Sequence, residues 1–158
     1  MSSIKYKILS MQVTKSDITS ENYEIEGSMQ ISNSFGFKVN VDNCLLLCNH
    51  ELSLKKDNKV FAEIELETIF YISKESFEEM KKEDKVEISR GFLVQCGSIS
   101  YGSLRGIVLR DTQKEGLNNI IIPPLYIEDI IKELDLGVLI VADAGLGTIN
   151  SVVTTVEY

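Results

Sequence analysis

The side chains that could carry chemistry include one histidine and three cysteines. His50 is the only histidine, so a Ser-His-Asp or Cys-His site would depend on it. It lies in CNHELSL, a stretch with the pattern of a structural strand, and we expect a packed or solvent-facing residue there. Cys44 and Cys48 are four positions apart, which puts them about 13 Å apart on one face of a strand. That separation is too large for one metal ion, and no metal site is expected.

Cys96 is the third cysteine, and no pair has CxxC spacing, which favours reduced thiols in a cytosolic chain. Glu63, Glu65 and Glu67 form an acidic ladder on one strand face. Acid–base catalysis needs carboxylates in a cleft with separated pKa values, so we interpret the ladder as a solvated surface or a docking patch.

Gly145 and Gly147 form a GLG sequence that suggests a dinucleotide motif. No helix pattern follows it, and no acidic residue stands about 20 positions further on, so the motif is incomplete. We expect a further hairpin there, with ADAGLGT as its turn. No catalytic constellation remains, and we predict that the chain is not an enzyme and uses no cofactor.

Composition narrows the class of protein further. The net charge of -8 excludes a general nucleic-acid binder, which needs a basic face. The chain has no run of about 18 apolar residues to span a membrane. Its N-terminal MSSIKYKILS lacks the apolar region of a signal peptide. These features predict a cytoplasmic protein of one domain.

The first half of the chain, residues 3–73, alternates like antiparallel strands. Residues 4–13 are apolar on both faces, which is typical of a central strand or of a strand at a subunit contact. Residues 43–73 are predicted to form a hairpin with its turn at 55–59, where Asp57 and Asn58 suit a turn. A short charged helix follows at 74–84, with Ser73 as its N-cap.

The second half is predicted to be helical around a proline-containing extended segment. Apolar residues recur at helical spacing over 98–113, and Gly116 suits the end of a helix. Pro123 and Pro124 favour an extended conformation before them. Helical spacing returns at 127–134.

This order resembles the SecB family of protein-export chaperones. The residues that carry the resemblance are YGSLRGIV at 101–108 and IIIPPLYIEDII at 120–131, and the likeness covers roughly residues 3–135. It implies an α+β fold, in which an antiparallel sheet of four or more strands packs with two C-terminal helices. The whole chain, 1–158, would form one such domain. Its apolar tail, 136–158, departs from the polar tail of the family.

The resemblance implies an ATP-independent holdase that binds unfolded or precursor polypeptides in apolar grooves, for export or for a toxin–antitoxin client. It also implies a homotetramer and, as a further partner, the SecA translocase motor or an antitoxin, with no nucleic acid and no membrane. The alternative is a regulatory subunit that binds one specific folded partner.

Two sets of site residues follow from this hypothesis. Aromatic side chains suit adaptable client contacts, although each is also a candidate for the core. The client-binding candidates are Phe35, Phe37, Phe61, Phe70, Tyr71 and Tyr126. The string VFAEIELETIF at 60–70 resembles the family's acidic docking strand, so the docking candidates are Glu63, with Glu24, Glu26, Glu65 and Glu67.

Overall fold

A computed structural model describes most of the chain. The described residues are 3–19, 21, 28–83, 85–117, 120–125, 138–142, 146–148 and 152–157.

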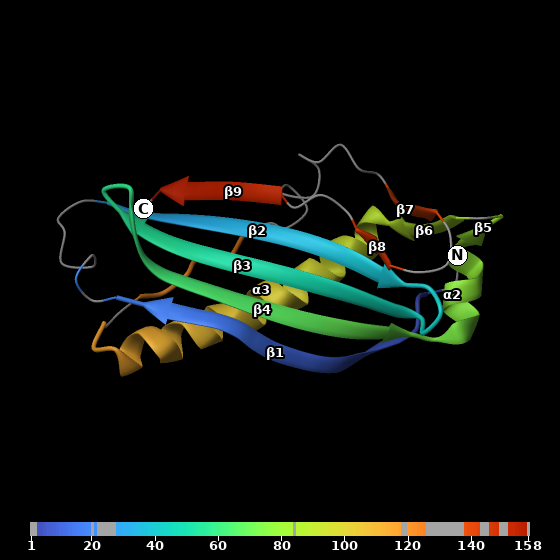
Figure 1. The fold of residues 1–158 in the computed structure, drawn as a ribbon, viewed down its shortest axis with the longest axis horizontal. Helices are drawn as coiled ribbons and strands as arrows, with labels where there is room; N and C mark the ends of the chain where they lie inside the picture. Colours follow the sequence, from blue (N-terminus) through green and yellow to red (C-terminus); the bar gives the residue numbers. More distant parts are fainter. Residues whose placement is uncertain are drawn as a thin grey trace.

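Four long strands form the main antiparallel sheet (Figure 1). They are β1 (Tyr6–Ile18), β2 (Met29–Asn40), β3 (Leu45–Lys56) and β4 (Lys59–Ile72). Their order is β1-β4-β3-β2, so β1 lies beside β4 and away from its neighbour in sequence. Two short strands from the tail, β8 (Leu146–Thr148) and β9 (Val152–Glu157), both pair antiparallel with β2.

The predicted hairpin at 43–73 is confirmed as β3 and β4. Asp57 and Asn58 connect the strands with positive φ values of 51° and 60°. Asn and Asp tolerate this left-handed region better than other non-glycine residues, and it matches the twist of a two-residue hairpin.

Two helices follow the sheet, α2 (Lys74–Met80) and α3 (Arg90–Lys114). The predicted cap Ser73 accepts a hydrogen bond from the backbone N–H of Ser76 at 3.2 Å. Ser89 caps α3 in the same way through the N–H of Phe92. In Figure 1, α3 crosses behind the sheet, where it packs against β3 and β4.

A second, small sheet joins β5 (Lys81–Lys82), β6 (Lys85–Ser89) and β7 (Val138–Ala142). This pairing corrects the predicted tail hairpin. β7 pairs with β6, whereas β8 pairs with β2, so the two strands belong to different sheets. The partner of each tail strand is set by free sheet edges elsewhere in the chain, and a local turn signal does not encode them.

The core lies between the sheet and α3. Alternate residues of β2, β3 and β4 point into it, as the two-residue period of a strand requires. From α3 it receives Leu104 and Val108, which are fully buried. Burial of this apolar face is the main favourable term in folding.

The predicted α+β fold with an antiparallel sheet is thus confirmed. The predicted helices at 74–84 and 98–113 correspond to α2 and to part of α3. The helix predicted at 127–134 lies outside the described residues. Among the described helices, none is long and apolar enough to cross a membrane.

Candidate functional site

Four of the six predicted client-binding aromatics lie in the core. Phe35, Phe37, Phe61 and Phe70 are each at most 1% exposed. Strand alternation turns Phe35, Phe37 and Phe70 toward the interior, whereas Phe61 is buried out of step with that alternation, next to the buried Ala62. At this degree of burial, none of the four side chains is available to a polypeptide client at the surface. Tyr71 is half-buried, with the Nζ of Lys7 5.6 Å from its ring centroid. Tyr126 lies outside the described residues.

The acidic ladder lies on the sheet face opposite the core. Glu63, Glu65 and Glu67 are each half-buried. The Nζ of Lys15 forms a 2.5 Å ion pair with Glu63, and the hydroxyl of Thr14 donates to Glu65 at 2.7 Å. Two of the three carboxylates are therefore already engaged by β1. The other docking candidates, Glu24 and Glu26, lie outside the described residues.

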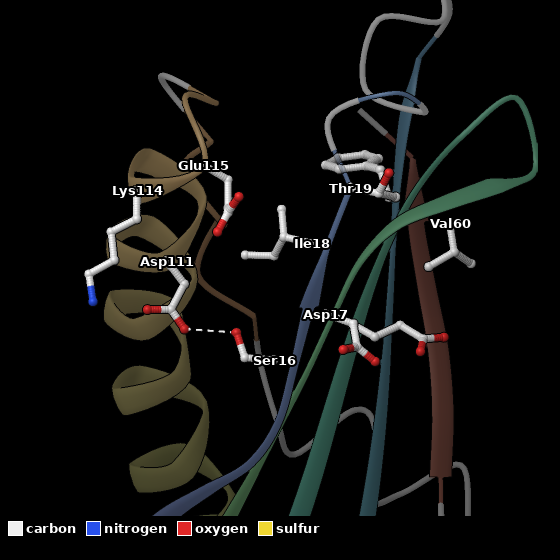
Figure 2. A pocket seen from close by; sticks show the side chains of 10 residues that line it. Ser16, Asp17, Ile18, Thr19, Val60, Asp111, Lys114 and Glu115 are labelled. Atoms are coloured by element: carbon white, nitrogen blue, oxygen red, sulfur yellow. Dashed lines mark hydrogen bonds between the residues drawn. The ribbon is translucent and has the colours of Figure 1, made fainter.

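A cavity of about 620 Å³ lies where β1 ends, β4 begins and α3 ends (Figure 2). Its size is within the range of small-molecule pockets. Its lining brings together three segments that are far apart in sequence. The lining residues are Ser16, Asp17, Ile18, Thr19, Val60, Phe61, Glu63, Asp111, Lys114 and Glu115.

Carboxylates dominate the polar lining of this cavity. The hydroxyl of Ser16 donates to Asp111 at 3.0 Å and links β1 to α3. Asp17 stands directly opposite Glu63 on the neighbouring strand. Figure 2 shows Glu115 turned toward Ile18, while Lys114 extends along the other side of α3. The end of α3 adds the partial negative charge of a helix C-terminus, so the cavity favours a positively charged group.

Sequence reasoning missed this cavity. Ser16 and Asp111 are 95 positions apart, and no periodic pattern links them before the strand order is known. Two of its lining residues are candidates from the sequence analysis: Phe61, predicted to bind a client, and Glu63, predicted to dock a partner. Within the described part of the chain, no group of three or more His, Cys, Asp or Glu residues could hold a metal ion.

Comparison with known proteins gives a short but close match to an enzyme. No family model matches the chain. The chain is 55% identical over 51 residues to the ATP-dependent dethiobiotin synthetase BioD of Brachyspira hyodysenteriae, a match that covers 28% of this chain and 23% of that protein. It is 49% identical over 51 residues to the BioD of Clostridium novyi, and 46% identical over 50 residues to that of Clostridium perfringens. The chain thus spans less than a quarter of the length of these relatives.

These matches overturn the functional hypothesis drawn from the sequence. The relatives are named as an ATP-dependent synthetase, so the SecB resemblance, the holdase function and the alternative of a regulatory subunit are wrong. The prediction that the chain is not an enzyme is wrong for the same reason. The predicted partners lose their support with it: unfolded polypeptides, the SecA motor, an antitoxin and the homotetramer. Short strings and element order misled the assignment, because neither of them defines the residues of a functional site.

The residues of the cavity do not fit ATP. A triphosphate needs cationic side chains or a glycine-rich loop of backbone N–H groups. The cavity instead presents four carboxylates, from Asp17, Glu63, Asp111 and Glu115, against the single cationic side chain of Lys114. The sequence also contains no Gly-Lys pair, so the GxxxxGK phosphate-binding motif does not occur in these 158 residues. We therefore derive no step that runs through ATP at this cavity.

Proposed function

We propose that this chain takes part in the ATP-dependent synthesis of dethiobiotin. The observation that carries the proposal is the 55% identity over 51 residues to a dethiobiotin synthetase. Identity at this level over about fifty residues is high enough to imply common descent of that stretch. Clostridial synthetases match at similar identity, which makes a chance match to one sequence a poor explanation.

In this proposal the chain contributes to the reaction without carrying out all of it. ATP binds to residues other than those of the acidic cavity. The matched stretch is 21–23% of each relative, so most of the relatives' residues have no counterpart in the match. A single domain over 1–158 and a cytoplasmic location, both predicted from the sequence, belong to the same proposal.

The experiment measures dethiobiotin directly. The chain carries an affinity tag in the cells that make it, and the retained material is incubated with ATP and an extract of small metabolites. Mass spectrometry then quantifies dethiobiotin. We expect ATP-dependent formation of dethiobiotin above the amount formed by material from cells with an untagged chain. The reason is that the tagged chain should be retained together with the other protein components that the reaction needs.

A matched control replaces ATP with a non-hydrolysable analogue, which should abolish product formation. The purified chain alone provides the second measurement. The proposal fails if neither the purified chain nor the retained material forms dethiobiotin above the untagged control.

A further inference from the structure

A second, smaller hollow lies between α3 and the extended segment 120–125. Its volume is about 270 Å³. It is lined by one cationic side chain, by aliphatic side chains that form its walls, and by two glycines that form its floor. The lining residues are Gly102, Arg105, Gly106, Leu109, Ile121 and Ile122.

Arg105 is held in a fixed orientation at this hollow. Its Nε donates a hydrogen bond to the backbone carbonyl of Ile122 at 2.8 Å. One turn earlier, the hydroxyl of Tyr101 donates to the carbonyl of Pro123 at 2.6 Å. These two bonds fasten the extended segment along α3 and position the guanidinium at its edge.

Within the described residues, no hydrogen bond or ion pair engages the terminal nitrogens of Arg105. The ion pairs among the described residues join Lys15 to Glu63 and Lys81 to Glu78, so Arg105 has no carboxylate partner there. A guanidinium whose Nε is occupied still presents a pair of parallel N–H groups at its end. That geometry matches the two oxygens of a carboxylate.

The walls of the hollow are unusually apolar for a protein surface. Leu109 is 37% exposed and Ile121 is 64% exposed, so both are among the exposed large apolar side chains of the described residues. The floor is open because Gly102 and Gly106 carry no side chain. A Cβ added at either position would meet no atom within 4 Å.

We propose that this hollow binds a small aliphatic carboxylic acid. The carboxylate takes the end-on N–H pair of Arg105, and the alkyl chain lies over the two glycines between Leu109 and Ile121. The aliphatic walls favour one charged group with an apolar tail over a polyanion. The site requires neither ATP nor dethiobiotin synthesis, so it goes beyond the proposed function and is tested separately.

The binding test compares hexanoate with hexylammonium, which has a chain of similar length and the opposite charge. The full chain is titrated while its backbone amide signals are followed by nuclear magnetic resonance. We expect hexanoate to shift the signals of Gly102, Gly106 and Ile121 along one saturable curve. Hexylammonium should leave them in place, because Arg105 repels it.

Variants separate the site from the stability of the helix. Gly106→Ala should raise the melting temperature, since alanine favours a helix more than glycine does. It should also weaken hexanoate binding, because its methyl group occupies the floor. Gly91→Ala is the matched control, since it makes the same change in the first turn of α3, and an added Cβ there also meets no atom within 4 Å. Gly91→Ala should leave hexanoate binding unchanged.

Arg105→Gln should weaken hexanoate binding about tenfold or more, through loss of a charged hydrogen-bonding pair.

Three results would overturn the proposal. The first is equal shifts from hexanoate and hexylammonium, which would mean that charge is not recognised. The second is hexanoate affinity that is unchanged in Gly106→Ala, which would place the ligand elsewhere. The third is shifts that scatter over the surface and do not saturate.

Discussion

The Nε2 atom of His50 and the amide oxygen of Asn33 lie 2.9 Å apart in a fully buried pair. The imidazole stacks on Phe35 with ring centroids 4.1 Å apart. Since the amide oxygen can only accept, Nε2 carries the proton and donates. The other ring nitrogen, Nδ1, is buried without a hydrogen-bond partner. The only histidine of the chain is therefore a neutral core residue, and this pair makes two predictions possible.

The first prediction concerns pH. Burial lowers the pKa of His50 from 6.5 to about 3. The unfolded chain therefore binds a proton at this position in the window from pH 6.5 down to about 3, while the folded chain does not. Stability is fully present above pH 6.5 and falls with decreasing pH, at a slope of up to about 1.4 kcal/mol per pH unit.

His50→Gln removes this titration and leaves the carboxylates in place. Urea unfolding of both proteins from pH 7.5 to pH 4.0 measures the difference. The free energy of unfolding of the parent should drop relative to the variant across this range. If the free energies of unfolding of the two proteins changed in parallel with pH, His50 would titrate alike in the folded and unfolded chains, and the prediction would be wrong.

The second prediction concerns the energy of the pair. Asn33→Leu leaves Nε2 of His50 as an unpaired buried donor, which should lower stability by about 1–3 kcal/mol. His50→Leu should likewise lower stability, because it leaves the buried amide oxygen of Asn33 without its donor. The double variant should be more stable than the sum of the two losses predicts, because no polar group is then left unpaired. A double-mutant cycle by urea denaturation checks this, and strictly additive losses would contradict it.

The third prediction concerns the aromatic residues of the core. Phe37 is 1% exposed and belongs to the core cluster. Phe37→Ala should therefore lower the free energy of unfolding by about 3–5 kcal/mol, through lost burial and a cavity. Tyr71→Ala, at a half-buried position on the same sheet, is the comparison and should have a clearly smaller effect. Equal losses at the two positions would argue against the core assignment.

The fourth prediction concerns thiol reactivity. Burial raises the pKa of Cys48 to about 12. Burial also raises the pKa of Cys96, and the nearby Cys48 raises it further. Because the thiolate is the reactive form, both should resist iodoacetamide in the folded chain at pH 8. Cys44 is only half-buried and should react first.

Mass spectrometry of the alkylated peptides reads out this order. A single adduct at Cys44 is expected in the folded chain, and three adducts after unfolding in urea. Labelling of Cys96 as fast as Cys44 in the folded chain would contradict the burial of the helix face.

The sequence patterns that resemble SecB do not indicate the match to dethiobiotin synthetases. The one warning was the apolar tail at 136–158, which departs from the SecB pattern. Its GLG at 145–147 suggests a dinucleotide motif, but that motif is incomplete. The described strands of this tail, β7, β8 and β9, add to two existing sheets, and no local pattern in the tail indicates that outcome.

The sequence by itself determined the local elements of this protein. Alternation over 60–72 predicted β4, Asp57 and Asn58 predicted the turn before it, and helical spacing predicted the centre of α3. Each of these signals comes from residues within one turn or a few strand positions of one another. Local backbone preference and side-chain periodicity are enough to specify them.

Only the tertiary structure decided which elements meet. It placed β1 at the sheet edge beside β4, where Ile8, Leu9, Met11 and Val13 are 40–50% exposed, and so excluded a central position for this strand. It brought Ser16 to Asp111, and Arg105 to Ile122. Those contacts depend on strand order and helix packing, which are set by the burial of the whole core. Both hollows are therefore properties of the folded chain that no single stretch of sequence encodes.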